Sequence, residues 1–375
     1  MVIQIDGINT QNKGAELMLV AILEEITLRV PDATIYLNPN GILDFSILPI
    51  DKLDVRQRFF LKYGKLVRKI LYKLHVPNTY FTHFYAMKGI DLMIDASGFQ
   101  FSDQWKHSEK NLKLREKYYK TLKSFNTKIV LLPQAFGPFE TSSGKRSVEI
   151  VSNNFDLIFA RELQSYDYLI KAGGDQRKIV KSCDFTFKVK GIVPEQYKFL
   201  EGAVCIIPNK KMITHADNGK SEYLDLLNNI IDYFEASEKK VFLLNHEGLG
   251  DEQLCRDVNS LRVDKLDILT NLTAKEVKGV IGNSNIVVSS RFHGVASALS
   301  QGVPCLATSW NHKYEMLFND FGQQNSVLKA NEDWTSNRDR IAYVVNNYDL
   351  ITSQLKTSKV KLIKVIDNMW NKLFK

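Results

Sequence analysis

Ile286-Val287-Val288-Ser289-Ser290-Arg291-Phe292-His293-Gly294-Val295-Ala296-Ser297-Ala298-Leu299 is the stretch around which this chain is organised. The apolar run at 286–288 has the length of a buried parallel strand, and the small and apolar residues after it suit a helix packed closely on a sheet. Arg291 and His293 are therefore expected at a strand-to-helix turn. Backbone N–H groups at a helix N-terminus attract anions, and Arg291 adds a forked donor for carboxylate or phosphate. His293 can carry a proton near neutral pH.

This turn has two interpretations. In the first, Arg291 binds an anionic ligand and His293 moves a proton, while Gly294 lets the backbone approach the ligand closely. In the second, Arg291 pairs with a structural carboxylate and His293 makes a capping hydrogen bond. The presence of both residues at one turn favours the first interpretation.

The length of 375 residues predicts two domains, and 44% hydrophobic with 25% charged residues is typical of a soluble globular enzyme. The four cysteines are far apart and form no Cys-x-x-Cys pair, which favours free thiols in a reducing cytosol. No signal peptide and no run of membrane-spanning length is found, so we expect a cytoplasmic protein.

The net charge of +8, from 50 Lys+Arg against 42 Asp+Glu, suits nucleic acid, an anionic membrane surface or an anionic substrate. The basic residues concentrate in segments 56–73 and 356–375, which both carry apolar residues at helical spacing. Each is either a packed helix with a solvated basic face or a peripheral contact with the inner face of the membrane. Aromatic and basic residues do not interleave as on a base-stacking surface, so no nucleic-acid partner is expected.

Short apolar runs alternate with helical patterns in both halves of the chain. Strands are expected at 2–6, 34–37, 91–95, 128–132, 156–160 and 179–180, and again at 204–207, 241–244, 286–288 and 303–307. Two such βαβ arrays predict an α/β protein with two Rossmann-like parallel-sheet domains facing across a cleft and a long C-terminal helix. The expected ranges are 1–190 for the N-terminal domain, 200–345 for the C-terminal domain and 346–375 for the helical tail.

Ligands collect at the carboxyl ends of parallel strands, so the loops that follow these strands are candidate binding loops. The first is the Gly/Asn loop at 7–14, which is neither a Walker A loop nor Gly-x-Gly-x-x-Gly. It either presents backbone N–H groups to an anion or is a polar turn before a helix. Arg161 follows another strand and is either a second anion clamp or the partner of Glu162. The seven histidines lack metal-ligand spacing and no Asp-x-Asp occurs, so no metal is expected.

Ser290-Arg291-Phe292-His293-Gly294, followed by Ala298, Gly302-Val303-Pro304 and Lys313, resembles the signature of the polysaccharide pyruvyl transferase family. The resemblance continues through the Asn9 to Glu16 loop, Gly98, Gln134 with Gly137-Pro138, Ala160-Arg161-Glu162 with Ser165, and Asp184, and it omits mainly residues 40–88 and the C-terminal tail. Two departures concern acceptor recognition: Gly14-Ala15-Glu16 stands where many members have Gly-Asp, and the usual glycine run is reduced to Ala96-Ser97-Gly98.

The resemblance implies a GT-B-like fold and a reaction in which phosphoenolpyruvate is the co-substrate and no other cofactor is needed. Members of this family transfer its carboxyethylidene group to two sugar hydroxyls, forming a ketal on a cell-surface polysaccharide or its lipid-linked precursor. His293 maps onto the catalytic acid/base position, and Arg161, Arg291 and the backbone of Phe292 map onto the donor-binding positions. The other residues expected to contact substrates are Ser290, Gly294, Lys313, Asn9, Asn12, Gly14, Glu16 and Gln134.

Two other functions fit the same fold. A glycosyltransferase could hold the diphosphate of a nucleotide sugar at the helix N-terminus. A non-catalytic relative could bind a glycan without turnover.

Overall fold

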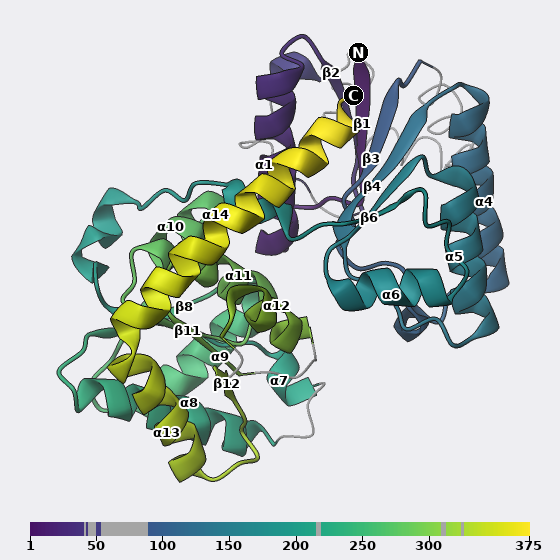
Figure 1. Ribbon diagram of the computed structural model, residues 1–375. Coiled ribbons are helices and arrows are strands. Elements are labelled where there is room, and N and C mark those ends of the chain that lie inside the picture. The colour runs from purple at the N-terminus through teal and green to yellow at the C-terminus, as the bar shows by residue number, and fades with distance from the viewer. Residues whose placement is uncertain (41–42, 44–49, 54–88, 215–218, 309–312, 324–325) are drawn as a thin grey trace, which may run out of the picture. The chain divides into compact units, whose positions relative to one another are not determined.

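The structure is a computed structural model that describes residues 1–40, 43, 50–53, 89–214, 219–308, 313–323 and 326–375. The chain divides into two compact units, each with its own sheet (Figure 1). Unit 1 comprises Met1–Thr10, Met18–Phe185 and Ile366–Lys375, and unit 2 comprises Gln11–Leu17 and Thr186–Val365. This division assigns residues 11–17 to unit 2 and the end of the C-terminal helix to unit 1. The basic segment 56–73 lies outside the described residues.

Unit 1 is built on a parallel sheet in which six described strands have the order β2-β1-β3-β4-β5-β6. The strands are β1 (Val2–Asp6), β2 (Thr34–Asn38), β3 (Leu92–Asp95), β4 (Lys128–Gln134), β5 (Leu157–Ala160) and β6 (Ile179–Lys181). Most of their residues are apolar and buried, as expected for a parallel sheet that is covered by helices. The strand order reverses between β1 and β3, so the loops after these two strands meet at a topological switch point.

The helices of unit 1 cover the two faces of this sheet. They are α1 (Lys13–Arg29), which begins in unit 2, α4 (Glu109–Ser124), α5 (Ser142–Asn154) and α6 (Leu163–Lys171). Figure 1 shows α4 and α5 side by side on one face and α1 on the other. Leu122 of α4 and Val151 of α5 pack into the same buried core as Met93 and Ile129 of the sheet. Ser108 caps the N-terminus of α4, because its side chain accepts a hydrogen bond from the N–H of Asn111.

Unit 2 repeats this architecture with six described strands in the order β12-β11-β10-β7-β8-β9. The strands are β7 (Val204–Ile207), β8 (Val241–Leu244), β9 (Asp267–Leu269), β10 (Ile286–Ser289), β11 (Cys305–Thr308) and β12 (Val327–Leu328). All four residues of β7, β8, β10 and β11 are buried. Here the order reverses between β7 and β10, which places the switch point at the loops after those strands.

The helices of unit 2 form two packed groups. They are α7 (Lys211–Thr214), α8 (Lys220–Glu235), α9 (Gly248–Ser260), α10 (Ala274–Gly282), α11 (Phe292–Leu299), α12 (Lys313–Phe321), α13 (Trp334–Asn346) and α14 (Tyr348–Leu373). Helix α11 packs on α10, α12 and β10, whereas α8 packs on α9, α13 and β8. The last helix, α14, buries an apolar stripe that includes Leu355, Ile366 and Trp370. The basic segment 356–375 therefore belongs to a packed helix, whose exposed side carries lysines such as Lys356, Lys364 and Lys372.

The predicted fold class is confirmed: two α/β units, each with a parallel sheet, precede a long C-terminal helix. The sequence analysis did not predict β9 and β12. These strands have only three and two residues, and hydrophobic periodicity needs a longer run to be recognised.

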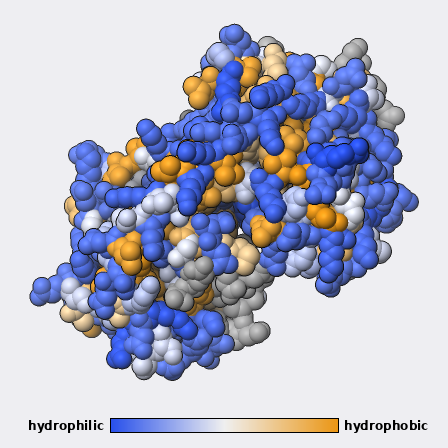
Figure 2. All heavy atoms as spheres, viewed as in Figure 1, coloured by the Kyte–Doolittle hydropathy of each residue, from blue (hydrophilic) through white to orange (hydrophobic). Residues whose placement is uncertain are grey.

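The face of the molecule shown in Figure 2 is mainly polar. Figure 2 shows hydrophilic residues over most of the visible face, with hydrophobic residues in small patches between them. Within the described ranges, no helix combines the length and the hydropathy needed to span a bilayer.

Candidate functional site

The turn after β10 is fixed by hydrogen bonds from three neighbouring elements. The Oγ atom of Ser290 forms hydrogen bonds with the Tyr223 hydroxyl of α8, at 2.5 Å, and with the Thr308 hydroxyl of β11. The carbonyl oxygen of Ser290 accepts hydrogen bonds from Asn209 Nδ2 at 2.7 Å and from the Tyr314 hydroxyl at 2.8 Å. Ser290 is buried, so these contacts hold the turn in place.

Gly294 allows α11 to approach the sheet closely. A Cβ atom at this position would lie 2.4 Å from Ser289 Oγ and 3.1 Å from Ile207 Cδ1. Both distances are shorter than ordinary van der Waals contacts, so a larger residue would push α11 away from β10 and β7. The close approach that the structure shows at Gly294 is thus between α11 and the sheet. A close approach of its backbone to a ligand stays a prediction.

Arg291 forms a partly buried ion-pair cluster with two carboxylates of the segment that follows β8. Its Nε atom donates to Asp251 Oδ2 at 2.7 Å, and its Nη1 atom is paired with Glu247 Oε2. Asp251 is 1% exposed, whereas the Glu247 side chain is 28% exposed. Burial raises the pKa of Asp251, and the charge of Arg291 opposes that shift. This is the carboxylate pairing that the second interpretation of the turn expects, and it fixes the direction of the guanidinium group.

The N-terminal loop joins the same cluster, about 280 residues away in sequence from the turn. Asn12 caps α1 by accepting hydrogen bonds from the N–H groups of Gly14 and Ala15, and its Nδ2 atom donates to Glu247 Oε1 at 3.1 Å. A Cβ atom on Gly14 would lie 2.1 Å from His293 Nδ1. Gly14 therefore leaves the space that the His293 ring occupies.

Glu16 connects the N-terminal loop to α10. Its carboxylate accepts a hydrogen bond from the N–H of Ala274 at 2.7 Å and pairs with Lys13 Nζ at 2.6 Å. Glu16 is buried. Because Ala274 is the first residue of α10, Glu16 satisfies an N-terminal amide of that helix.

His293 lies in the first turn of α11 and is partly exposed. Its ring packs edge-on against Phe292 with 5.3 Å between the ring centroids, and Phe292 packs in turn against Tyr314 at 6.1 Å. The imidazole is thus held between the Gly14 backbone and an aromatic side chain. This fixed orientation is what a group that transfers protons requires.

His246 is a further residue of this cluster, and the sequence analysis missed it. It lies between β8 and α9, is 4% exposed, and has no hydrogen-bond partner for its buried Nδ1 atom within the described ranges. Burial lowers the pKa of His246 well below 6.5, and the charges of Arg291, His293 and Lys13 lower it further. The imidazole of His246 is therefore neutral near pH 7. Its place just beyond the end of β8 is the signal that could have identified it.

The remaining predicted residues lie in unit 1 or begin α12. Arg161 follows β5, is 8% exposed, and places its Nε atom 3.2 Å from Glu162 Oε2. Its N–H donates to the carbonyl of Gln134 at 3.1 Å, and Gln134 Oε1 accepts from the N–H of Gln100 at 3.2 Å. Asn9 Nδ2 donates to Asn40 Oδ1.

The predicted residues are therefore divided between the two units. The N-terminal loop from Asn12 to Glu16 and the turn at 290–294 come together in unit 2, and Lys313 begins α12 there. Arg161 belongs to unit 1. The convergence of Arg161 with Arg291 and His293 on one ligand stays a prediction.

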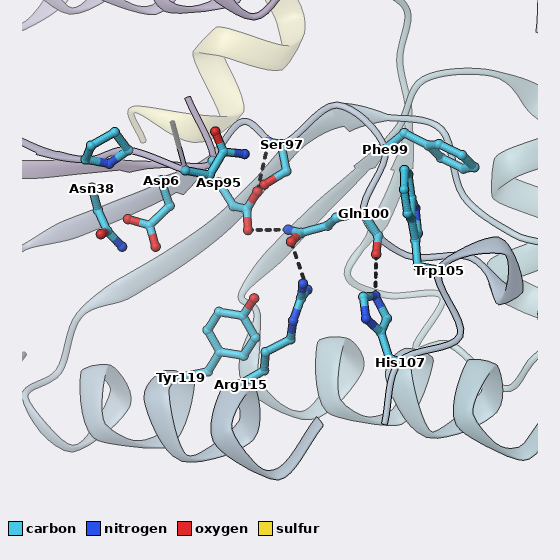
Figure 3. Close-up of a pocket in the computed structure, with 13 residues that line it drawn as sticks. Asp6, Asn38, Asp95, Ser97, Phe99, Gln100, Trp105, His107, Arg115 and Tyr119 are labelled. Carbon is cyan, nitrogen blue, oxygen red and sulfur yellow. Dashed lines mark hydrogen bonds between the residues drawn. The ribbon is translucent and has the colours of Figure 1, made fainter. Parts of the chain in front are cut away.

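A cavity of about 530 Å³ lies at the switch point of unit 1, and the sequence analysis did not assign it (Figure 3). Asp6 and Asp95 lie at the ends of β1 and β3, and these two residues are partners in the sheet register. Aromatic side chains, including Trp105, line another part of the cavity. No group of three His, Cys, Asp or Glu side chains suited to a metal ion is found in the part of the chain that the structure describes.

Comparisons with known proteins give a family and a fold. A sequence model described as polysaccharide pyruvyl transferase matches residues 12–312. No curated protein matches the chain.

Several solved structures match nearly the whole chain. Anabaena HepE in complex with UDP and glucose is 13% identical, with a TM-score of 0.57 over 99% of this chain and 97% of that chain. MnaA of S. aureus with UDP is 10% identical, with a TM-score of 0.56 over 96% and 90% of the two chains. The UDP-GlcNAc 2-epimerase of Methanocaldococcus jannaschii is 11% identical, with a TM-score of 0.54 over 91% and 92%. At such identities the likeness shows the fold alone, and the expected GT-B-like arrangement of two Rossmann-like domains is the one these proteins share.

Proposed function

Because the chain belongs to the polysaccharide pyruvyl transferase family, we propose that it transfers the carboxyethylidene group of phosphoenolpyruvate to two hydroxyls of one sugar. The proposed acceptor is a cell-surface polysaccharide or its lipid-linked precursor at the cytoplasmic face of the membrane. The observation that carries the proposal is the packing of the family's Arg-Phe-His turn against the N-terminal loop, where Gly14 makes room for the His293 ring.

The proposed reaction balances without an oxidant or a reductant. One hydroxyl oxygen adds to C2 of phosphoenolpyruvate while the methylene carbon C3 gains a proton and becomes a methyl group. The second hydroxyl oxygen then bonds to C2 as the C2–O bond to phosphate breaks, so that inorganic phosphate leaves with the remaining proton. Proton transfer at C3 and at the hydroxyls is general acid-base work, which contributes about 100-fold to 10,000-fold in rate.

His293 is the proposed acid/base because it is a partly exposed, titratable group held in one orientation at the switch point of unit 2. His246 is neutral and buried beside it, so it adds no second positive charge near pH 7. Of the two histidines, only His293 is partly exposed, which supports it as the proposed proton carrier.

Arg291 is the proposed donor-binding cation. Asp251 contacts it from a buried position and fixes the guanidinium, whereas Glu247 contacts it from the more exposed side. We infer that the carboxylate or phosphate of phosphoenolpyruvate replaces Glu247 on Arg291, since both are anions that pair with a guanidinium fork. The amides of the first turn of α11 add hydrogen-bond donors to the proposed donor site. Arg161 of unit 1 stays a predicted donor-binding residue.

The proposal is tested by incubating the protein with phosphoenolpyruvate and glycan acceptors and measuring phosphate release together with ketal formation. His293→Ala and His293→Gln are both expected to lower turnover at least about 100-fold. The glutamine variant keeps a hydrogen-bonding side chain that cannot exchange a proton, so it separates proton transfer from packing. Binding of phosphoenolpyruvate, measured by calorimetry, should persist in the glutamine variant. Wild-type turnover in either histidine variant, or stabilisation by UDP-sugars but not by phosphoenolpyruvate, would overturn the proposal.

A further inference from the structure

The cavity in unit 1 lies where a parallel α/β sheet ordinarily binds its ligands. It opens beyond the carboxyl ends of β1 and β3, the two strands between which the strand order reverses. Its volume of about 530 Å³ falls within the range of small-molecule sites.

The floor of this cavity is a pair of carboxyl groups held by hydrogen bonds. Asp6 accepts hydrogen bonds from Gln4 Nε2 at 2.5 Å and from the Tyr118 hydroxyl at 2.6 Å. Asp95 accepts them from the N–H of Ser97 at 3.0 Å and from Gln100 Nε2 at 2.5 Å. A carboxyl group, ionised or protonated, has more hydrogen-bonding sites than these donors occupy, so both groups keep capacity for the hydroxyls of a ligand.

The opposite side of the cavity is aromatic. Figure 3 shows two groups of side chains on either side of Gln100: Asp6, Asn38 and Asp95 in one, and Phe99, Trp105 and His107 in the other. The Phe99 and Trp105 rings pack edge to face with 5.7 Å between centroids, and Trp105 is 47% exposed. A large, half-exposed aromatic surface beside polar groups is typical of sites that bind ligands with an apolar face and a polar rim.

Gln100 connects the two sides. It donates to Asp95 through Nε2 and accepts from Arg115 Nη1 at 2.8 Å through Oε1, and its carbonyl oxygen is 2.9 Å from His107 Nε2. The guanidinium of Arg115 lies 5.5 Å from the centroid of the Phe101 ring. Arg115 therefore contributes positive charge near the two carboxyl groups while remaining bound to protein groups.

These features favour a neutral polyhydroxylated ligand. An anion would meet the acidic pair of Asp6 and Asp95, whereas the positive charge of Arg115 offsets part of the attraction that this pair would exert on a cation. Sugar hydroxyls both donate to carboxylates and accept from amides such as those of Asn38 and Asn40, while the C–H face of a sugar ring is apolar.

We propose that this cavity binds one neutral sugar ring of the acceptor glycan, with its hydroxyls toward Asp6 and Asp95 and one ring face against Trp105. The inference rests on the proposed function, because it names the residues of unit 1 that recognise the acceptor of that reaction.

The test is binding of the methyl glycosides of glucose, galactose, mannose, N-acetylglucosamine and N-acetylmannosamine to the full chain, measured by saturation-transfer NMR and titration. At least one glycoside is expected to bind wild-type protein. Trp105→Ala should weaken that binding at least about tenfold, because a Trp in a binding surface commonly contributes that much. Trp105→Phe should retain part of the affinity, since it keeps an aromatic face.

Two controls make the outcome decisive. Tyr343→Ala removes an aromatic side chain of the same 47% exposure from α13, in unit 2, and should leave glycoside binding unchanged. Thermal unfolding of each variant checks that Trp105→Ala is folded. If none of the glycosides binds, or if Trp105→Ala binds as tightly as wild type, the inference is wrong.

A parallel titration with phosphoenolpyruvate separates this inference from the proposed function. Binding of phosphoenolpyruvate without any glycoside would contradict only the sugar site. Binding of a glycoside without phosphoenolpyruvate would contradict the proposed transfer reaction and leave the sugar site standing.

Discussion

The two units present opposite chemistry at equivalent places. In both, the loops after the central strands meet where the strand order reverses, at β1 and β3 in unit 1 and at β7 and β10 in unit 2. Unit 1 places two carboxyl groups and aromatic rings there. Unit 2 places Arg291 and His293 there, with His246 nearby. The fold supplies the location of a site, and the few residues after each strand decide which ligand it fits.

The same contrast appears in the pKa values. Burial, together with the neighbouring charge of Asp95, raises the pKa of Asp6 to about 7. Burial lowers the pKa of His246, and the nearby cations lower it further. Both shifts favour the neutral form, so each switch point holds a buried titratable group that is costly to charge.

The largest effect is expected when Asp251, the buried carboxylate that pairs with Arg291 in unit 2, is removed. Asp251→Ala leaves the guanidinium of Arg291 with Glu247 alone, and the free energy of unfolding should fall by about 3 kcal/mol, as expected when one partner of a buried pair is lost. Urea denaturation measures this. Asp175→Ala, which removes the partner of the exposed Arg177, should leave the free energy of unfolding nearly unchanged. Equal effects of the two substitutions would show that Asp251 is not holding a buried charge.

Substitution of Asp6 in unit 1 is expected to have a smaller effect on the free energy of unfolding, and this effect depends on pH. The pKa of Asp6 is about 7 in the folded protein and 3.8 ordinarily, so the unfolded chain loses this proton first. Between about pH 4 and pH 7 the free energy of unfolding therefore falls as the pH rises, and the cost is complete above pH 7. Asp6→Asn removes the titration, so it should stabilise the protein more at pH 8 than at pH 5, by about 2 kcal/mol.

Denaturation of both proteins at these two pH values gives the difference. Asp175→Asn is the matched control, because the pKa of Asp175 is about 2 and lies below that window. A substitution effect of Asp6→Asn that is the same at both pH values would mean that the carboxyl group titrates normally.

The smallest effect concerns competition for Arg291. Glu247→Gln removes the more exposed of its two anionic partners but keeps an oxygen that can accept from Asn12 Nδ2. Since a partly exposed ion pair contributes about 1 kcal/mol at most, the KM for phosphoenolpyruvate should fall by no more than about fivefold. Glu252→Gln, which removes the partner of the exposed Arg256, should leave KM unchanged. A higher KM in Glu247→Gln would instead show that Glu247 helps to hold the donor.

The sequence was sufficient for the fold because the buried strands are continuous apolar runs with helical patterns between them. β1, β7 and β8 have the predicted limits, and the Ser289 to Leu299 stretch forms the predicted strand-to-helix turn. The matched family is also the one indicated by the Arg-Phe-His signature.

The sequence could not indicate which carboxylates hold Arg291, because Glu247 and Asp251 lie about 40 residues before it and belong to no motif. His246 carries no spacing pattern, so only its place just beyond the end of the predicted strand β8 could have indicated it. The cavity in unit 1 was missed for the same reason: its lining residues come from segments between Asp6 and Tyr119. Side chains brought together by tertiary structure leave no local signal.

The division of α1 and α14 between the units bears on how the protein can be dissected. Residues 11–17 belong to unit 2 although they are covalently embedded in the segment that builds unit 1, and α14 passes from unit 2 back into unit 1 after Val365. A fragment cut once at Phe185 would therefore separate Asn12, Gly14 and Glu16 from the residues they contact, which are Glu247, His293 and Ala274. Neither fragment would contain all the residues that pack in its unit. Each sheet is therefore better studied by point substitutions in the intact chain than by truncation.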